Sequence, residues 1–347
     1  MKTKDPAAIR AAIEEKSTLR PRDIAHAIGV SEAAVAATDV GRTMRRIEAS
    51  PDRLMPHICD LGDVMALTRN ESAVHERTGR YEEWHSGSHA SMVLGSEIDL
   101  RIFPRHWCHG FAYQSEGNTK GPTRSIQIFD TFGEAVHKVY PRDGTDLDLW
   151  DRMVDALATD NTSDSVTVEP LPDPEGAKTR PEKADALREA WRRMTDTHQF
   201  LRLVSKFRMN RLGAYRIAGA PFARPLAPQA VDAALGRVAE NGTQIMLFVG
   251  NRGCIQIHSG KIETLKQMGP WQNVLDERFN LHLRIDQIAE AWLVQKPTKR
   301  GMALSVEAFD AEGRLILQLF GLRKEHADYT HAFAEMAEAL PVLETVE

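Results

Sequence analysis

Apolar side chains recur at helical spacing just past the middle of the chain. The set is Leu187, Trp191, Met194, His198 and Leu201, at successive intervals of four, three, four and three residues. Because one face of an α-helix repeats about every 3.6 residues, this spacing predicts a helix with a single histidine on its apolar face. Two interpretations of His198 stay open here: a buried structural imidazole, or a metal or heme ligand. Cations that could meet the carboxylates of a ligand follow at Arg202, Lys206, Arg208 and Arg211.

Helical patterns also open the chain. The pattern of residues 5–16 predicts one helix. Residues 19–35 show the pattern of a helix-turn-helix, with Gly29 at the turn and Ser31 as N-cap of the second helix. Taken alone, this motif favours DNA binding. The second helix, however, offers Glu32 and four alanines where base-reading Arg, Asn or Gln side chains are needed. We therefore favour a structural helical hairpin.

The pattern then changes to short runs of β-branched and aromatic residues bounded by Gly, Asn, Asp or Pro. These runs predict antiparallel strands at 64–67, 72–76, 91–94, 98–103, 107–114, 125–130 and 135–140. Residues 146–158 carry apolar side chains at helical spacing and predict an amphipathic helix that covers one face of the sheet.

The second half of the chain repeats this design. Residues 64–113 align without a gap onto 245–294, so that Met65 matches Met246, Asn70 matches Asn251 and Leu100 matches Leu281. After one deleted residue, the match resumes with Ser125, Phe129, Asp130 and Gly133 against Ser305, Phe309, Asp310 and Gly313. The repeat is too long for a solenoid and indicates a duplicated domain.

The predicted fold class is therefore α+β, with an internal duplication that gives two similar lobes, each a large antiparallel sheet with packed helices. We place the lobes at 1–160 and 181–347, joined by a linker at 161–180 that is rich in Pro, Asp, Ser and Thr. The helix-turn-helix pattern is matched in the second lobe by residues 206–218, where no DNA-binding signature survives. This match further weakens the DNA-binding interpretation.

The composition of the chain mainly excludes classes of protein. The 347 residues are 42% hydrophobic and 27% charged, which is ordinary for a soluble globular protein. The formal charge of −5 gives no basic footprint for nucleic acid, and the three cysteines form no C-x-x-C pair for a disulfide framework or a zinc site. Without an apolar stretch or an apolar N-terminal signal, we expect no membrane insertion, no secretion and a cytoplasmic location.

Several segments together resemble the bacterial hemin-degrading and heme-trafficking proteins of the HemS/ChuS/HmuS group. They are residues 64–76, 98–103, 250–258, 269–276, 296–298 and 320–324, and the resemblance extends over nearly the whole chain. It implies two similar halves, with heme in a cleft that involves the central helices and the C-terminal sheet.

The resemblance also implies roles for single residues. His198 would be the axial ligand of heme iron, with Asp196 and Phe200 in the expected places beside it. Arg101 and Phe103 would lie on the distal side, where Arg101 could hold a water near iron-bound oxygen and so serve catalysis. Phe248 would pack on the macrocycle. The residues expected to face the propionates are Arg211, Lys296, Gln318 and Arg323.

Two further positions bear on heme binding. His75 is a candidate ligand for a second heme-binding mode, although its repeat partner is Gln256 and an exposed histidine at a strand end is the simpler account. Phe320 stands where some relatives have a tyrosine, which removes one hydroxyl near the ligand. Arg101 aligns with His282 of the second lobe, so a site that uses one lobe's copy would break the symmetry there.

The function implied is that of a cytoplasmic heme-binding protein of heme-iron acquisition that degrades heme oxidatively and releases iron. Heme would be ligand and substrate, O2 and an external electron donor would be required, and a reductase and a heme-import system would be partners. The alternative is a heme chaperone that hands heme to another enzyme without turnover. A DNA-binding regulator would rest on residues 20–35 alone.

Overall fold

The computed structural model describes residues 4–118 and 121–343 of the chain. It divides into two compact units: unit 1 comprises Met1–Arg69, Glu76–Pro172 and Gly250–Gln256, and unit 2 comprises Asn70–His75, Asp173–Val249 and Ile257–Glu347. The short segments 70–75 and 250–256 are the exceptions to a division in chain order. Both units combine antiparallel strands with packed helices, which confirms the α+β class.

Five strands of unit 1 lie side by side in one sheet, and each neighbouring pair is antiparallel. In spatial order they are β1 (Met44–Ile47), β7 (His109–Asn118), β8 (Gly121–Phe129), β9 (Ala135–Thr145) and β2 (Gly62–Arg69). Three shorter strands pair in the order β6 (Asp99–Ile102), β5 (Ser91–Leu94) and β4 (Glu83–His85). Strands β3 (Ala73–Gly79) and β12 (Cys254–Gly260) contain residues of both units.

The helices of unit 1 begin and end at recognisable signals. They are α1 (Pro6–Glu15), α2 (Pro21–Ile28), α3 (Glu32–Ala37), α4 (Pro51–Cys59) and α5 (Leu147–Leu157), with a short 3-10 turn at Pro104–His106. Gly29 ends α2 in a left-handed conformation at φ 68°, and the Ser31 side chain accepts a hydrogen bond from the backbone N–H of Ala34 at 3.2 Å. The predicted helix-turn-helix pattern is thus confirmed as the pair α2–α3.

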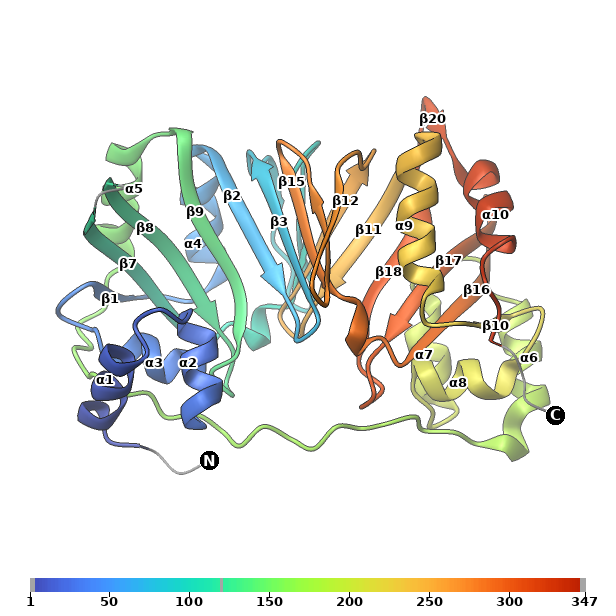
Figure 1. Cartoon of the computed structure of the whole chain (residues 1–347), viewed down its shortest axis with the longest axis horizontal. Helices are drawn as coiled ribbons and strands as arrows, with labels where there is room; N and C mark the ends of the chain where they lie inside the picture. The colour runs from blue at the N-terminus through green and yellow to red at the C-terminus, as the bar shows by residue number, and fades with distance from the viewer. Residues whose placement is uncertain (1–3, 119–120, 344–347) are drawn as a thin grey trace. The chain divides into compact units, whose positions relative to one another are not determined.

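The two faces of the unit 1 sheet are covered differently. Helices α4 and α5 pack on one face through side chains such as Leu54 and Trp150, and α3 packs on the other through Ala33 against Phe111 (Figure 1). Five of the six residues of α3 are buried. A helix buried against its own sheet cannot enter a DNA groove, so its structure agrees with the structural interpretation.

Unit 2 repeats the strand order of unit 1. Its five-strand row is β10 (Ala223–Leu226), β16 (Glu290–Thr298), β17 (Gly301–Phe309), β18 (Leu315–Gly321) and β11 (Ile245–Gly250). Its three-strand row is β15 (Phe279–Arg284), β14 (Trp271–Leu275) and β13 (Leu265–Met268), and β19 (Arg323–Lys324) pairs with β20 (Ala327–Asp328). Element for element, these rows correspond to those of unit 1, which confirms the internal duplication.

Helices cover both faces of the five-strand row in unit 2. They are α6 (Ala184–Arg192), α7 (Gln199–Lys206), α8 (Arg211–Ala218), α9 (Ala230–Asn241) and α10 (Thr330–Glu338), with 3-10 turns at Pro181–Lys183 and Ile285–Gln287. Helices α9 and α10 bury one face, and α6, α7 and α8 bury the other over β10 and β16 (Figure 1). The pair α7–α8 corresponds to α2–α3. No helix among residues 4–118 and 121–343 is long and apolar enough to cross a membrane.

The predicted linker at 161–180 has little regular structure, yet each of its halves is tied to a unit. In unit 1, the Arg46 guanidinium donates to the carbonyls of Ser163 and Ser165 at 3.1 and 2.6 Å. In unit 2, the backbone N–H of Lys178 donates to the Asn210 side chain at 3.0 Å. The segment is therefore anchored to the unit at each end, although most of its residues are exposed.

Candidate functional site

His198 does not lie on the apolar face of a continuous helix, so that part of the sequence prediction is wrong. Helix α6 ends at Arg192 and α7 begins at Gln199, which makes His198 the N-cap residue of α7. Its side chain is 89% exposed. The helix breaks because the Asp196 carboxylate accepts the backbone N–H of His198 at 2.8 Å, a local bond of the kind by which Asp competes with helical pairing.

The same carboxylate orients the imidazole. Asp196 Oδ1 also accepts the Nδ1–H of His198 at 2.7 Å. The backbone N–H and the ring of His198 together lower the pKa of Asp196, so the carboxylate stays ionised. With the proton held on Nδ1, the lone pair of a neutral imidazole is on Nε2, the atom that is then ready to bind a metal. An exposed, carboxylate-oriented histidine has the geometry of a ligand rather than of a core residue.

A buried cluster of charged residues lies beneath α7 and α8. Its centre is Glu307 of β17, which is 0% exposed. The carboxylate accepts four hydrogen bonds: to Oε1 from Lys296 Nζ at 2.6 Å and Ser305 Oγ at 2.8 Å, and to Oε2 from Arg211 Nη1 at 3.0 Å and Tyr215 OH at 2.8 Å. We call these five residues the Glu307 cluster. Every carboxylate lone pair has a donor, as burial of a charge requires.

The charges of the cluster do not cancel. Burial would raise the pKa of Glu307, but Lys296 and Arg211 outweigh it and hold that pKa at about 2. Burial lowers the pKa of Lys296 to about 8, partly opposed by Glu307, while Tyr215 and Glu307 overcome burial and raise the pKa of Arg211. Two cations against one carboxylate leave one excess positive charge at neutral pH, which favours an anionic ligand nearby.

Two of the predicted propionate contacts belong to this cluster. Lys296 is 3% exposed and is committed to Glu307 and Tyr215. The side chain of Arg211 is 20% exposed, and its Nη1 donates hydrogen bonds to Glu307 and Tyr215. Among the described residues, its Nε and Nη2 have no hydrogen-bond partner. Sequence reasoning missed Glu307 and Tyr215. A usable signal existed, because Glu307 corresponds to the neutral Gln127 of the first lobe.

Next to the cluster, the sheet presents a half-buried aromatic surface. Phe248, Gln318 and Glu307 are cross-strand partners on β11, β18 and β17, so their side chains lie on one face. Phe320 follows Gln318 by two residues on β18, so its side chain lies on the same face. Its ring centroid is 5.4 Å from that of Phe248. Phe248, Gln318 and Phe320 are all half-buried. This surface offers ring contacts and an amide beside the excess positive charge.

The remaining predicted residues lie elsewhere in the two units. Arg323 on β19 is exposed and faces Asp328 at 3.4 Å. In unit 1, Arg101 on β6 pairs with Asp99 and donates to the carbonyl of Leu100 at 3.0 Å. Phe103, also in unit 1, follows β6, and its backbone N–H donates to the carbonyl of Gly253 at 2.9 Å. Arg101 and Phe103 are half-buried.

His75 is fully buried, so the expectation of an exposed strand-end histidine is wrong. Its ring lies 4.9 Å from that of Phe279 in unit 2. A role in a second heme-binding mode stays a prediction, and it would require the ring to be uncovered first. Among the residues that the structure describes, no group of three or more His, Cys, Asp or Glu side chains could hold a metal ion. Heme iron differs, because one axial histidine suffices for it.

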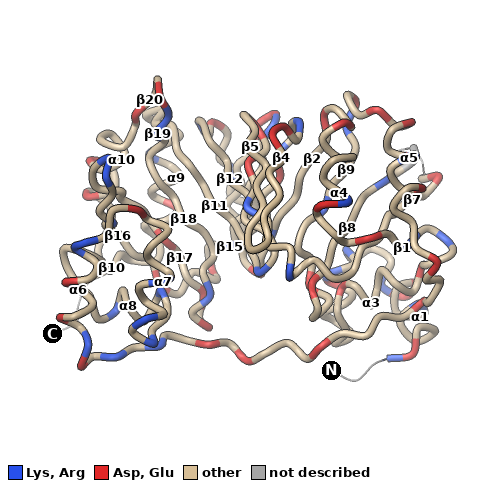
Figure 2. The backbone as a smooth tube through the Cα atoms, turned by 180° about the vertical axis from the view of Figure 1, so that it is seen from behind, with Lys and Arg blue, Asp and Glu red and all other residues tan. Residues whose placement is uncertain are grey.

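Exposed cations surround α7. Arg202 and Lys206 on α7 and Arg208 after it are exposed. Figure 2 shows Lys and Arg positions in blue at α7 and α8. Lys299 lies close by, since its backbone N–H donates to the carbonyl of Thr195 at 2.9 Å. The surface near His198 is therefore locally basic although the chain as a whole carries a formal charge of −5.

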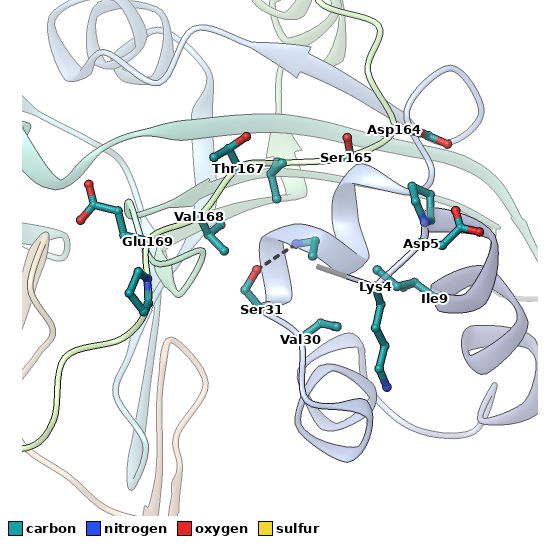
Figure 3. Close-up of a pocket in the computed structure, with 14 residues that line it drawn as sticks. Lys4, Asp5, Ile9, Val30, Ser31, Asp164, Ser165, Thr167, Val168 and Glu169 are labelled. Atoms are coloured by element: carbon teal, nitrogen blue, oxygen red, sulfur yellow. Dashed lines mark hydrogen bonds between the residues drawn. The ribbon is translucent and has the colours of Figure 1, made fainter. Parts of the chain in front are cut away.

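A cavity of about 680 Å³ in unit 1 is separate from these residues. It lies between the start of α1, the α2–α3 turn and residues 164–170, as Figure 3 shows. Lys4, Ser31 and Glu169 are among its lining side chains, and none of the predicted site residues is. We therefore do not include it in the candidate site.

These features define a class of protein: an internally duplicated α+β protein with an exposed, oriented histidine and, in the same unit, a basic cluster with an aromatic surface. Two stretches of the chain, residues 29–157 and 208–340, match the model of one family, the haemin-degrading HemS.ChuX domain. They correspond to the repeated elements from α3 to α5 and from α8 to α10. The chain belongs to this family and carries its domain twice.

Similar proteins extend over nearly the full chain. The hemin transport protein HmuS of Yersinia pestis is 37% identical over 305 residues, 88% of each protein. Among solved structures, holo-PhuS, a heme-binding protein from Pseudomonas aeruginosa, has a TM-score of 0.92 and 39% identity, with 98% of this chain and 100% of that chain covered. The Escherichia coli heme oxygenase ChuS has a TM-score of 0.85 and 32% identity, with 95% and 98% covered.

Proposed function

We propose that the protein is a cytoplasmic heme-binding protein of heme-iron acquisition that degrades heme oxidatively and releases its iron. The observation that carries the proposal is the exposed His198 imidazole, whose Nδ1–H is held by Asp196 so that Nε2 can bind heme iron. The relatives support this proposal, because they are described as a hemin transport protein, a heme-binding protein and a heme oxygenase.

In this proposal heme is the substrate, and with O2 and an external electron donor it supplies the redox chemistry. The residues of the chain bind and orient it. Phe248 offers a ring face to the macrocycle, and Arg211, through Nε and Nη2, donates to a propionate. Gln318 and Arg323 are further propionate donors, whereas Lys296 acts mainly through its charge, since a direct contact would require it to leave Glu307.

The distal side is assigned to Arg101 and Phe103. Arg101 would orient a water toward the substrate, and Phe103 would exclude bulk solvent. Both assignments follow from the family resemblance. The expected partners are a reductase that delivers electrons and a heme-import system that delivers the substrate.

A heme chaperone that passes heme on without turnover is the second candidate. It is favoured by the relative described as a hemin transport protein, and the same ligand histidine and basic residues would serve it. The two functions differ in one outcome, which is whether bound heme is consumed.

Turnover under reducing conditions separates these candidates. We expect the heme complex, supplied with a reductase, its nicotinamide donor and O2 in the presence of catalase, to lose its Soret band and yield an open-chain tetrapyrrole. Catalase removes free peroxide, which destroys heme without enzymatic control. A Soret band that persists while heme passes to an added apo-protein would identify a chaperone instead.

In the same assay, Arg101→Ala should slow heme turnover more than it weakens heme binding.

Replacing Asp196 with asparagine is expected to weaken heme binding. The amide cannot hold the Nδ1–H of His198 as an anion does, so the imidazole becomes a poorer donor and loses its fixed orientation. Loss of such a partner costs about 10- to 100-fold in metal affinity. Titration of the apo-protein with ferric heme measures the change, and a Kd equal to that of the wild-type protein would contradict the role of Asp196.

A further inference from the structure

We propose that Glu307 is a positioning residue for the heme ligand His198, acting through the two cations of its cluster and the ring of Phe200. The inference rests on the proposed heme-binding function. Glu307 itself is too deeply buried to touch a ligand, since it is 0% exposed. Its effect must therefore pass through neighbouring side chains.

The first step is the fixed position of the carboxylate. Each of its oxygens accepts two hydrogen bonds, and three of the four donors come from Ser305, Lys296 and Tyr215, which are all buried. A buried carboxylate with four donors, two of them cationic, has one low-energy orientation, because any rotation leaves a charged group unpaired. The carboxylate thereby fixes the Lys296 ammonium and the Arg211 guanidinium in space.

The second step is the contact between these cations and α7. Lys296 Nζ lies 5.0 Å and Arg211 Cζ lies 5.8 Å from the centroid of the Phe200 ring. Cations at such distances attract the ring, and more strongly in a desolvated site. Phe200 is 1% exposed and also contacts Trp191 at 4.6 Å and Tyr215 at 5.5 Å between ring centroids. The ring is therefore held between the aromatic core and the two cations.

The third step leads from Phe200 to the ligand. Helix α7 has eight residues. Phe200 and Val204 are its buried residues, and Leu203 is partly buried against the same core, so these side chains anchor the helix. Phe200 is the second residue of the helix, two positions after His198. Leu201 and Arg202, the next two residues, are exposed and give no anchorage. A change in the position of the Phe200 ring therefore moves the start of α7, and the imidazole of His198 moves with it.

Unit 1 contains a matched buried carboxylate without a ligand histidine. Glu32, the first residue of α3, corresponds to Arg211, the first residue of α8, and it forms a buried ion pair with Lys138. The position of Glu307 is taken by Gln127. Glu32→Gln therefore removes a buried negative charge from a sheet-and-helix arrangement of the same kind. It serves as the control for loss of stability alone.

The experiment compares the full-length Glu307→Gln and Glu32→Gln variants in their complexes with heme. The readouts are the Kd for ferric heme and the iron–histidine stretching band of the ferrous complex in resonance Raman spectra, together with thermal stability. We expect Glu307→Gln to shift or broaden that band and to raise the Kd about tenfold, in the range for lost supporting contacts. Glu32→Gln should lower stability and leave band and Kd unchanged.

A second variant decides the matter if Glu307→Gln does not fold. Phe200→Leu keeps the Glu307 cluster but removes the ring through which it acts, and we expect the same change in the iron–histidine band. An unchanged band and a Kd within twofold of the wild-type value, in whichever of the two variants folds, would overturn the proposal. If instead the wild-type protein and His198→Ala gave identical heme spectra, another residue would ligate the iron, and the ligand assignment of His198 within the proposed function would fail, not merely the role of Glu307.

Discussion

Replacing His198 with alanine is expected to raise the Kd for ferric heme by about a hundredfold or more and to change the Soret spectrum. The exposed imidazole of His198 has its Nε2 oriented for a bond to iron, whereas His75, the other candidate ligand, is fully buried. A hundredfold loss corresponds to about 2.7 kcal/mol of binding free energy. Because His198 is exposed and outside the core, the variant should fold as well as the wild-type protein.

The chain offers a matched control for this experiment. His331 of α10 is 87% exposed and, like His198, directs Nδ1 toward a carboxylate, that of Glu335 at 3.6 Å. His331→Ala should leave both the Kd and the Soret band as they are. Heme binding that survives His198→Ala with the same spectrum would show that another residue ligates the iron.

Most of the fold could be predicted from the sequence because it rests on local patterns that are written twice. Short runs of β-branched and aromatic residues marked the strands that became β2, β8 and β9, and the second copy repeated the pattern at the equivalent strands. Gly29 and Ser31 marked the boundary between α2 and α3. A signal that occurs in both lobes is also less exposed to chance than a signal that occurs once.

The environment of His198 was mispredicted for a physical reason. Leu187, Trp191 and Met194 are buried as their spacing predicts, but the helical period does not continue to His198. The side chain of Asp196 accepts the backbone N–H of His198 and so offers a local alternative to helical pairing. Periodicity counts apolar residues and does not register this competition, so His198 was assigned to the wrong surroundings.

The Glu307 cluster was missed because it depends on contacts distant in sequence. Arg211 and Glu307 are 96 positions apart and meet only after α8 has packed on the sheet. The sequence indicated basic residues for a ligand, yet it did not indicate that Lys296 would be buried against an internal carboxylate. Buried charges require partners, so an unmatched Glu on a predicted central strand is itself a signal to search for them.

The largest expected effect on stability comes from Gly213→Ala in α8. A Cβ atom at this position would lie 1.8 Å from the carbonyl oxygen of Lys178 and 2.3 Å from its carbonyl carbon. Because these are backbone atoms, the 173–180 segment or α8 has to move. Such overpacking costs about 3 kcal/mol, more than the gain of about 1 kcal/mol from the higher helix propensity of alanine. We expect the Tm of the protein to fall by several degrees.

Gly236→Ala in α9 is the matched control, since a Cβ there would meet no atom within 4 Å. It gains helix propensity without a clash and should keep or raise the Tm in the same thermal denaturation experiment.

The displacement caused by Gly213→Ala should also reach the ligand site. Asn210 caps α8 by accepting the N–H of Gly213 at 2.9 Å and also accepts the N–H of Lys178, so α8 and the 173–180 segment share one anchor. Movement of that anchor shifts Arg211, and we expect weaker heme binding at temperatures where the variant is still folded. A Gly213→Ala protein with wild-type Tm and Kd would show that the close approach of Lys178 to α8 does not exist in solution.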